Sequence, residues 1–142
     1  MVISVEKAST DHIAAISQLD LKVLGSTVRN EYLLKSVAED KVWVATTAGS
    51  VLGFVVMDKS FFGNAFIHIL IVEQDSRRQG IGSLLIEKIE SISPTDKLFT
   101  STNRSNNAMQ CLCESLGFIK SGYIENLDEG DPEIVYFKKL ER

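Results

Sequence analysis

A glycine-rich turn between an apolar run and a helical pattern is the part of the sequence best suited to chemistry. It reads Val72-Glu73-Gln74-Asp75-Ser76-Arg77-Arg78-Gln79-Gly80-Ile81-Gly82-Ser83. Glycines at 80 and 82 let the backbone approach a ligand closely, and unpaired N–H groups at a helix start favour an anion. Arg77 and Arg78 add positive charge beside them. The turn therefore predicts a pyrophosphate site, and a turn that merely starts a helix is the alternative.

The spacing of these glycines differs from that in two common phosphate motifs. A P-loop needs a lysine after its last glycine, whereas Gly82 is followed by Ser83. A dinucleotide fingerprint needs a third glycine at position 85, where the chain has Leu85. The sequence therefore disfavours a nucleotide triphosphatase and a dinucleotide-binding protein.

The elements that must position the turn follow the order β-α-α-β-β-β-α-β-α-β-β. Gly25 and Pro94 end helical patterns, and Asn106 is a helix cap. The run 65–72 is continuously apolar, which predicts a central strand covered on both faces. The expected strands are 2–7, 42–47, 51–58, 65–72, 97–102, 118–125 and 134–140, and the expected helices lie at about 10–24, 27–38, 81–92 and 107–116. The fold class is α/β, with a mixed sheet and a parallel crossover between 65–72 and 97–102.

Composition bounds the class of protein. The 142 residues predict one domain spanning residues 1–142. Nineteen acids against fifteen bases give a formal charge of −4, so no global field favours nucleic acid or anionic lipid. Without a leader or an apolar run near the roughly 18 residues of a membrane span, a cytoplasmic protein is expected. Cys111 and Cys113 stand at positions i and i+2 of an expected helix and point to different faces, which makes a mutual disulfide geometrically poor, and no metal site is expected.

The element order and three short motifs resemble the GNAT superfamily of acetyl-CoA-dependent N-acetyltransferases. The motifs are Arg77-x-x-Gly80-x-Gly82 after an apolar strand, Asn106, and Leu116-Gly117-Phe118. The likeness covers the whole chain. It implies a GNAT-like mixed central sheet of about seven strands with helices on both faces. It also implies direct transfer of acetyl from acetyl-CoA to a primary amine of a small molecule or peptide; a non-catalytic acyl-CoA-binding regulatory or sensory module is the alternative.

The resemblance also implies where coenzyme A binds. In this family the fourth strand splays from the fifth, and the pantetheine arm adds alongside the fourth strand in a V-shaped cleft. A backbone N–H of that strand, Leu70 or Ile71 here, would polarise the thioester carbonyl. Asn106 would reach the pantetheine from the other wall. The residues expected to bind the cofactor are Leu70, Ile71, Val72, Arg77, Arg78, Gln79, Gly80, Ile81, Gly82, Ser83 and Asn106.

The resemblance assigns the catalytic roles as well. Family members often place a glutamate base four residues before the strand-ending valine, and this chain has His68 there. An imidazole titrates near pH 6.5 and suits removal of an ammonium proton. The alternatives are a strand histidine hydrogen-bonded for structure, and Glu73 acting through water. Cys113 replaces the tyrosine that protonates the departing sulfur, so it is either that acid or an apolar filler.

The sequence constrains the acceptor less than the cofactor. The loop 125–133 holds five acids and borders the acceptor site in this family, which favours a cationic acceptor; a solvated loop is the alternative. Arg29, Tyr32 and Glu73 are the expected substrate-binding residues, and the first two equally favour an anionic acceptor. A homodimer is a further expectation, because family members often form dimers.

Overall fold

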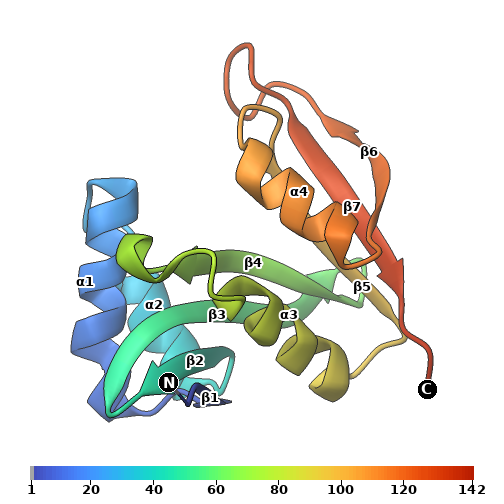
Figure 1. The fold of residues 1–142 in the computed structure, drawn as a ribbon. Helices are drawn as coiled ribbons and strands as arrows, with labels where there is room; N and C mark the ends of the chain where they lie inside the picture. The colour runs from blue at the N-terminus through green and yellow to red at the C-terminus, as the bar shows by residue number, and fades with distance from the viewer. Residues whose placement is uncertain (1) are drawn as a thin grey trace. The chain divides into compact units, whose positions relative to one another are not determined.

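The computed structural model describes residues 2–142, which form one seven-stranded sheet and four α-helices (Figure 1). The strands are β1 (Ser4–Lys7), β2 (Val42–Thr47), β3 (Ser50–Phe61), β4 (Asn64–Val72), β5 (Lys97–Asn103), β6 (Ile119–Ile124) and β7 (Glu133–Lys139). The helices are α1 (Ile13–Leu24), α2 (Asn30–Ala38), α3 (Ile81–Ile92) and α4 (Asn107–Ser115). The strands pair in the order β1-β2-β3-β4-β5-β7-β6, with β4 and β5 parallel. The predicted fold class, element order and parallel crossover are thus confirmed.

Individual residues explain where the helices begin and end. Gly25 follows α1 in the left-handed region, at φ 77°, where a glycine carries no Cβ penalty. Oδ1 of Asn106 accepts a hydrogen bond from the N–H of Met109 (3.1 Å) and so caps α4. Pro94 lies just beyond α3 and cannot continue it. None of the helices in residues 2–142 is long and apolar enough to span a membrane.

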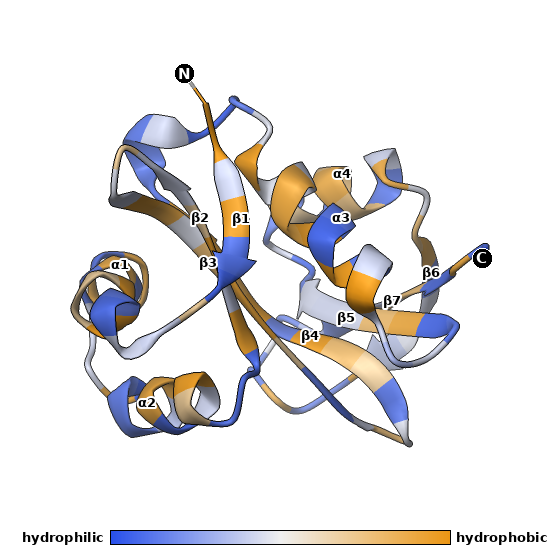
Figure 2. Cartoon of the chain, turned by 90° about the horizontal axis from the view of Figure 1, so that it is seen from below, coloured by the Kyte–Doolittle hydropathy of each residue, from blue (hydrophilic) through white to orange (hydrophobic). Residues whose placement is uncertain are grey.

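The chain packs into two compact units that share β3 and β4. The first unit comprises the residues up to Met57 together with Ile69–Ile89, and the second comprises Asp58–His68 with Glu90–Arg142. In the first unit α1 and α2 lie side by side (Figures 1 and 2). The core cluster of this unit contains Ala8, Ile16, Leu19, Leu33, Val37, Val42, Val44, Phe54, Val56, Ile69 and Ile71.

Gly53 on β3 allows close packing within the first unit. A Cβ at this position would lie 2.7 Å from the carbonyl oxygen of Ile71 on β4 and 3.3 Å from Cδ1 of Leu85 on α3. Backbone atoms cannot move aside as the end of a flexible side chain can. Only glycine therefore lets β3, β4 and α3 pack at this distance.

The burial of β4 differs from the sequence prediction. Alternate residues Ala65, Ile67, Ile69 and Ile71 are buried, whereas Phe66, His68, Leu70 and Val72 are at least partly exposed. The prediction of a strand covered on both faces is therefore wrong. A continuous apolar run does not distinguish a fully buried strand from one whose second face is apolar but partly open, because apolar surface is common on folded proteins.

Candidate active site

The turn after β4 is closed by Glu73. Its backbone N–H donates to the carbonyl of Leu52 (2.7 Å), and its carboxylate accepts a hydrogen bond from Oγ of Ser76 (3.0 Å). The short 3-10 helix Gln74–Ser76 follows directly. The Glu73 carboxylate thus has a structural partner within the turn.

The start of α3 presents backbone N–H groups that precede the hydrogen-bond ladder of the helix. Arg78 and Gly80 both have left-handed backbone angles, φ 69° and 77°, which turn the chain sharply before the helix. The N–H of Leu84 donates to the carbonyl of Gly80 (3.0 Å), so the N–H groups that precede Leu84 in the first turn have no acceptor within the helix. Arg77 and Arg78 are exposed. This donor set fits a pyrophosphate, because dipole, N–H groups and guanidinium groups all favour an anion.

The first half of the strand that leads into this turn pairs with β5. Ala65, Phe66 and Ile67 lie opposite Leu98, Phe99 and Thr100. Oγ1 of Thr100 also donates to the carbonyl of Ile67 (3.0 Å).

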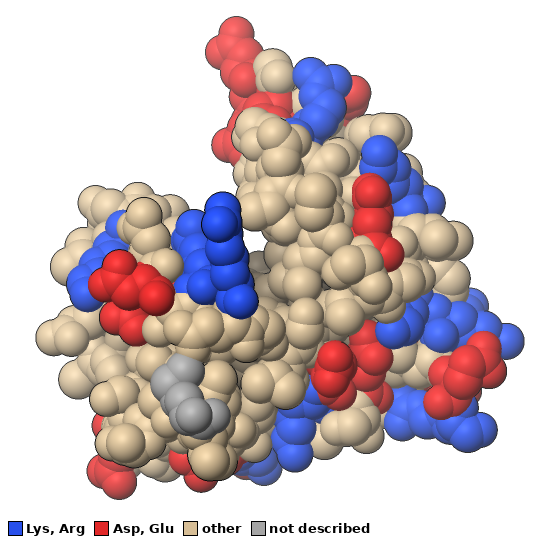
Figure 3. Space-filling model, in the orientation of Figure 1, with Lys and Arg blue, Asp and Glu red and all other residues tan. Residues whose placement is uncertain are grey.

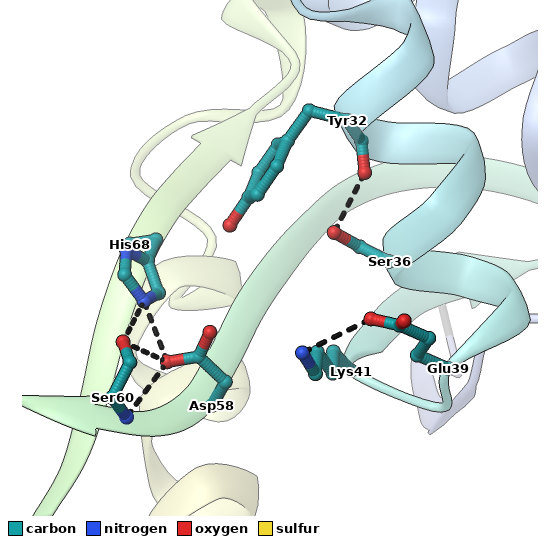
Figure 4. Close-up of polar contacts among 7 residues, drawn as sticks. All are labelled: Tyr32, Ser36, Glu39, Lys41, Asp58, Ser60 and His68. Atoms are coloured by element: carbon teal, nitrogen blue, oxygen red, sulfur yellow. Dashed lines mark hydrogen bonds and ion pairs between the residues drawn. The ribbon is translucent and has the colours of Figure 1, made fainter.

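His68 on β4 belongs to a small polar cluster with two residues of β3 (Figure 4). Its Nε2 lies 2.6 Å from Oδ1 of Asp58 and 3.1 Å from Oγ of Ser60. Ser60 donates to the same carboxylate oxygen, from Oγ at 2.6 Å and from its backbone N–H at 3.1 Å. The side chain of His68 is 30% exposed, so solvent reaches the ring while its partners hold it.

The Asp58 carboxylate determines which ring nitrogen of His68 carries a proton. An ionised carboxylate only accepts hydrogen bonds, so Nε2 must be the N–H donor in this contact. The Ser60 hydroxyl donates its own proton to Asp58, and its oxygen lone pair is then oriented toward Nε2–H. Neutral His68 therefore has its lone pair on Nδ1, the nitrogen that can take a proton from a substrate.

The pKa of Asp58 is lowered from its ordinary value. Burial acts to raise that pKa, but the hydrogen bonds from Ser60 and His68 and the charge of His68 together outweigh it. The carboxylate is thus ionised at neutral pH and can stabilise an imidazolium. Asp58 and Ser60 were missed in the sequence; their signal was a short polar stretch just before a hairpin turn and a histidine-bearing strand.

Cys113 lies on the core side of α4. It is fully buried, and this burial, with a contribution from the charge of Glu114, raises the pKa of its thiol to about 12. A buried thiol with so high a pKa is a weak proton donor to an external sulfur. The geometry therefore supports the packing interpretation of Cys113, and Cys111 of the same helix is exposed.

The residues expected at the acceptor have partners of their own. Arg29 forms a two-pronged ion pair with Asp20 on α1, through Nη2 to Oδ1 and through Nε to Oδ2 at 3.2 Å. The Asp20 carboxylate is fully buried, so this pair compensates its charge and joins α1 to the start of α2. The Tyr32 side chain is 40% exposed, and its carbonyl accepts from Oγ of Ser36 (2.7 Å; Figure 4).

The acidic loop between β6 and β7 is fastened at several points. Acidic side chains gather at its tip (Figure 3). Three of its five acids bond to β5 or the turn after it: Asp128 to Nδ2 of Asn103 (2.8 Å), Asp131 to Oγ of Ser105 (2.6 Å) and Glu133 to Oγ of Ser101 (2.8 Å). These acids therefore have a structural function besides their charge.

The comparisons with known proteins point to one family. Residues 38–120 match the model of the acetyltransferase (GNAT) domain. An acetyltransferase of the GNAT family from Bacillus cereus ATCC 10987 is 40% identical, with 100% of both chains covered and a TM-score of 0.96. Ard1 from Thermoplasma volcanium is 19% identical over 100% of both chains, with a TM-score of 0.89. The structure of yncA from Salmonella typhimurium with its cofactor acetyl-CoA is 18% identical, covers 100% of this chain and 96% of that one, and has a TM-score of 0.83. A search of curated proteins finds no match.

The two more distant structures show the shared fold. The family match extends over more than half of the chain, and the Bacillus cereus protein is similar along its whole length. Among residues 2–142 no group of three or more His, Cys, Asp or Glu side chains is arranged to hold a metal ion. The chain therefore belongs to the GNAT family of acetyltransferases and is an acetyl-CoA-dependent N-acetyltransferase.

Proposed function

We propose that the protein transfers acetyl directly to a primary amine of a small molecule or peptide, with His68 as the general base. The observation that carries this proposal is the 2.6 Å contact between Nε2 of His68 and Oδ1 of Asp58. It leaves Nδ1 as the proton acceptor on a partly exposed ring. Asp58 and Ser60 act as positioning residues because they hold the tautomer and the ring orientation.

The base is needed because the acceptor arrives protonated. An alkylammonium with a pKa near 10.4 is neutral in only about one molecule in 2,500 at pH 7. His68 takes the proton at Nδ1, and Asp58 stabilises the imidazolium that results. A positioned base of this kind contributes roughly 10²–10⁴-fold to the rate.

The cofactor residues are the second part of the proposal. Bound acetyl-CoA supplies the acetyl group as an activated thioester. We assign its pyrophosphate to the N–H groups of Arg78–Ser83 with Arg77, and its pantetheine arm to the backbone of Leu70, Ile71 and Val72. We assign Asn106 to the same cofactor through a hydrogen bond from its side-chain NH2, because its Oδ1 already caps α4. His68 and Leu70 are two residues apart in the sequence of β4.

Release of free CoA with a panel of amines tests this function. Wild-type protein is expected to release CoA in the presence of at least one amine. In His68→Gln, kcat should fall by about 10²–10⁴-fold while KM for acetyl-CoA is unchanged. His12→Gln is the matched control, because His12 is the other histidine and has other partners: its Nδ1 accepts the N–H of Ser9 (3.0 Å), and its Nε2 lies 3.7 Å from Oε1 of Glu6.

Two results would contradict the proposal in different ways. Saturable acetyl-CoA binding without turnover of any amine would favour the regulatory binding module. Full activity of His68→Gln with an unchanged pH–rate profile would remove His68 from the reaction and leave the acetyl transfer in place.

A further inference from the structure

A row of aromatic side chains crosses the sheet of the second unit and reaches His68. Phe66 on β4 pairs with Phe99 on β5, and Phe99 pairs with Phe137 on β7. Ring centroids are 4.8 Å apart for Phe61 and Phe66, 5.0 Å for Phe61 and Phe99, and 5.2 Å for Phe99 and Phe137. The Phe66 ring in turn lies edge-on to the His68 ring at 4.8 Å. We call Phe61, Phe66, Phe99 and Phe137 the phenylalanine row.

The phenylalanine row lies on the open face of this part of the sheet. All four rings are partly exposed, whereas Leu98 and Tyr136, the neighbours of Phe99 and Phe137 in sequence, are fully buried on the opposite face. The Tyr136 hydroxyl donates to the carboxylate of Glu114 on α4 (2.8 Å), so α4 covers that opposite face. A contiguous apolar surface with polar residues at its rim is typical of a binding site.

The two ends of the phenylalanine row carry opposite charges. At one end, two residues before Phe99 on β5, Lys97 lies opposite Lys139 of β7. Two residues after Phe99, Ser101 binds the carboxylate of Glu133, and Asp58 lies beside His68 at that same end. A cationic amine is repelled from the lysine end and attracted to the carboxylate end, where Nδ1 of His68 can receive its proton.

We propose that the phenylalanine row binds the carbon substituent of the acceptor, so that the preferred acceptors are primary amines bearing an aryl group a few bonds from the nitrogen. This inference rests on the proposed function, because the amine must be delivered to His68. With the nitrogen at His68, the contact between Phe66 and His68 makes the row the next surface that the substituent meets. Rings that lie on aromatic surfaces gain area burial together with favourable edge or offset-stacked contacts.

The test compares 2-phenylethylamine with ethylamine on the full chain. Binding of each amine to CoA-loaded protein is measured by calorimetry, and kcat/KM is measured by CoA release. Wild-type protein should prefer 2-phenylethylamine by about tenfold or more in both measurements, since apolar sites discriminate by roughly 10–200-fold for a small apolar group. Phe99→Ala should remove most of that preference, and Phe99→Leu should keep part of it because it preserves apolar volume.

Phe99 is the most informative position for this test because its ring lies against Phe61 and Phe137. The ring that lies against His68, the proposed base, is that of Phe66, which stays in place when Phe99 is substituted. Tyr123→Ala is the matched control, since Tyr123 is a 57% exposed aromatic residue on β6 of the same sheet, paired with Ile134 outside the row. The control should keep the wild-type preference. Phe99→Leu also provides a folded variant if Phe99→Ala does not fold.

The outcomes separate this inference from the proposed function. Equal binding and turnover of both amines by the wild type, or an unchanged preference in Phe99→Ala and Phe99→Leu, would overturn the role of the row and leave the acetyl transfer intact. Selective binding of 2-phenylethylamine that Phe99→Ala removes, without turnover of either amine, would support the role of the row in binding and contradict the proposed delivery of the bound amine to His68.

Discussion

At the residue scale, the hydrogen bond from His68 to Asp58 is the contact on which the proposed base depends. Asp58→Asn replaces an obligate acceptor by an amide that can donate to Nε2, which favours the tautomer with its proton on Nδ1. We expect kcat to fall by about tenfold or more, with KM for acetyl-CoA unchanged, in steady-state kinetics. Ser60→Ala keeps the carboxylate and should cost less; equal losses in the two variants would contradict the tautomer argument.

The lowered pKa of Asp58 also makes a prediction about stability. A carboxyl group whose folded pKa lies below its ordinary value of 3.8 stabilises the native state above that pH and loses this contribution as the pH falls through the folded pKa. The difference in the free energy of unfolding between wild type and Asp58→Asn should therefore shrink as the pH falls from about 4 through the folded pKa of Asp58. Urea unfolding at pH 4, 3 and 2 measures it, and a difference that grows below pH 4 would contradict the sign.

The two cysteines should differ sharply in reactivity. Burial raises the pKa of Cys113 to about 12, whereas Cys111 on the same helix is exposed. A thiol-specific disulfide reagent at pH 8 should label one thiol rapidly and the second only after unfolding, because the thiolate is the reacting species. Cys111→Ala should abolish the rapid phase, and rapid labelling of Cys113 would contradict its burial. Cys113→Ser should in addition retain activity if the packing interpretation holds.

At the element scale, Asn106 combines a capping role with a proposed ligand contact. Its Oδ1 accepts the N–H of Met109, and Asn106→Asp keeps that acceptor while replacing the side-chain NH2. We therefore expect Asn106→Asp to preserve stability and to raise the Kd for acetyl-CoA. Asn106→Ala should in contrast cost about 1 kcal/mol of stability as well. Thermal unfolding and calorimetric titration check both variants, and unchanged acetyl-CoA affinity in Asn106→Asp would limit Asn106 to capping.

The packing of β3, β4 and α3 gives a second prediction at this scale. In Gly53→Ala the new Cβ would lie 2.7 Å from the carbonyl oxygen of Ile71, so the strands must shift, at about 1–3 kcal/mol. Because Ile71 belongs to the backbone proposed for pantetheine, acetyl-CoA affinity should fall too. Gly130→Ala meets no atom within 4 Å and carries only the cost of its left-handed φ, about 1 kcal/mol. Equal stability of the two variants in urea unfolding would contradict the close approach.

At the scale of the whole molecule, residues that begin or end a helix made the order of the elements predictable. Gly25, Pro94 and Asn106 end or begin helices as expected, because each acts through its own backbone or its immediate neighbours. Partners in different strands could not be read in the same way. β3 was expected to end at Asp58 but continues to Phe61, and this extension carries Ser60 to His68.

The same distinction applies to the candidate site. The glycine-rich turn is contiguous in sequence, so its donor groups could be anticipated from residue types alone. The partner of Arg29 lies nine positions away on another helix, and the buried Asp20 that holds it carries no local signal. The type of an isolated charged residue therefore leaves its role open, because contacts with other elements of the fold determine that role.

Net charge and local charge make opposite predictions for binding of an anionic cofactor. The chain has a formal charge of −4, which opposes an anion, whereas Arg77 and Arg78 are exposed just before the N–H groups at the start of α3. If the local field dominates, Arg77→Gln with Arg78→Gln should weaken acetyl-CoA binding by about tenfold, 1.4 kcal/mol, and reduce its salt dependence. Lys22→Gln with Lys35→Gln changes the net charge by the same amount on α1 and α2 and should leave the affinity near wild type. Titrations at low and physiological salt make the comparison, and equal losses in the two double variants would show that the field of the whole molecule governs binding.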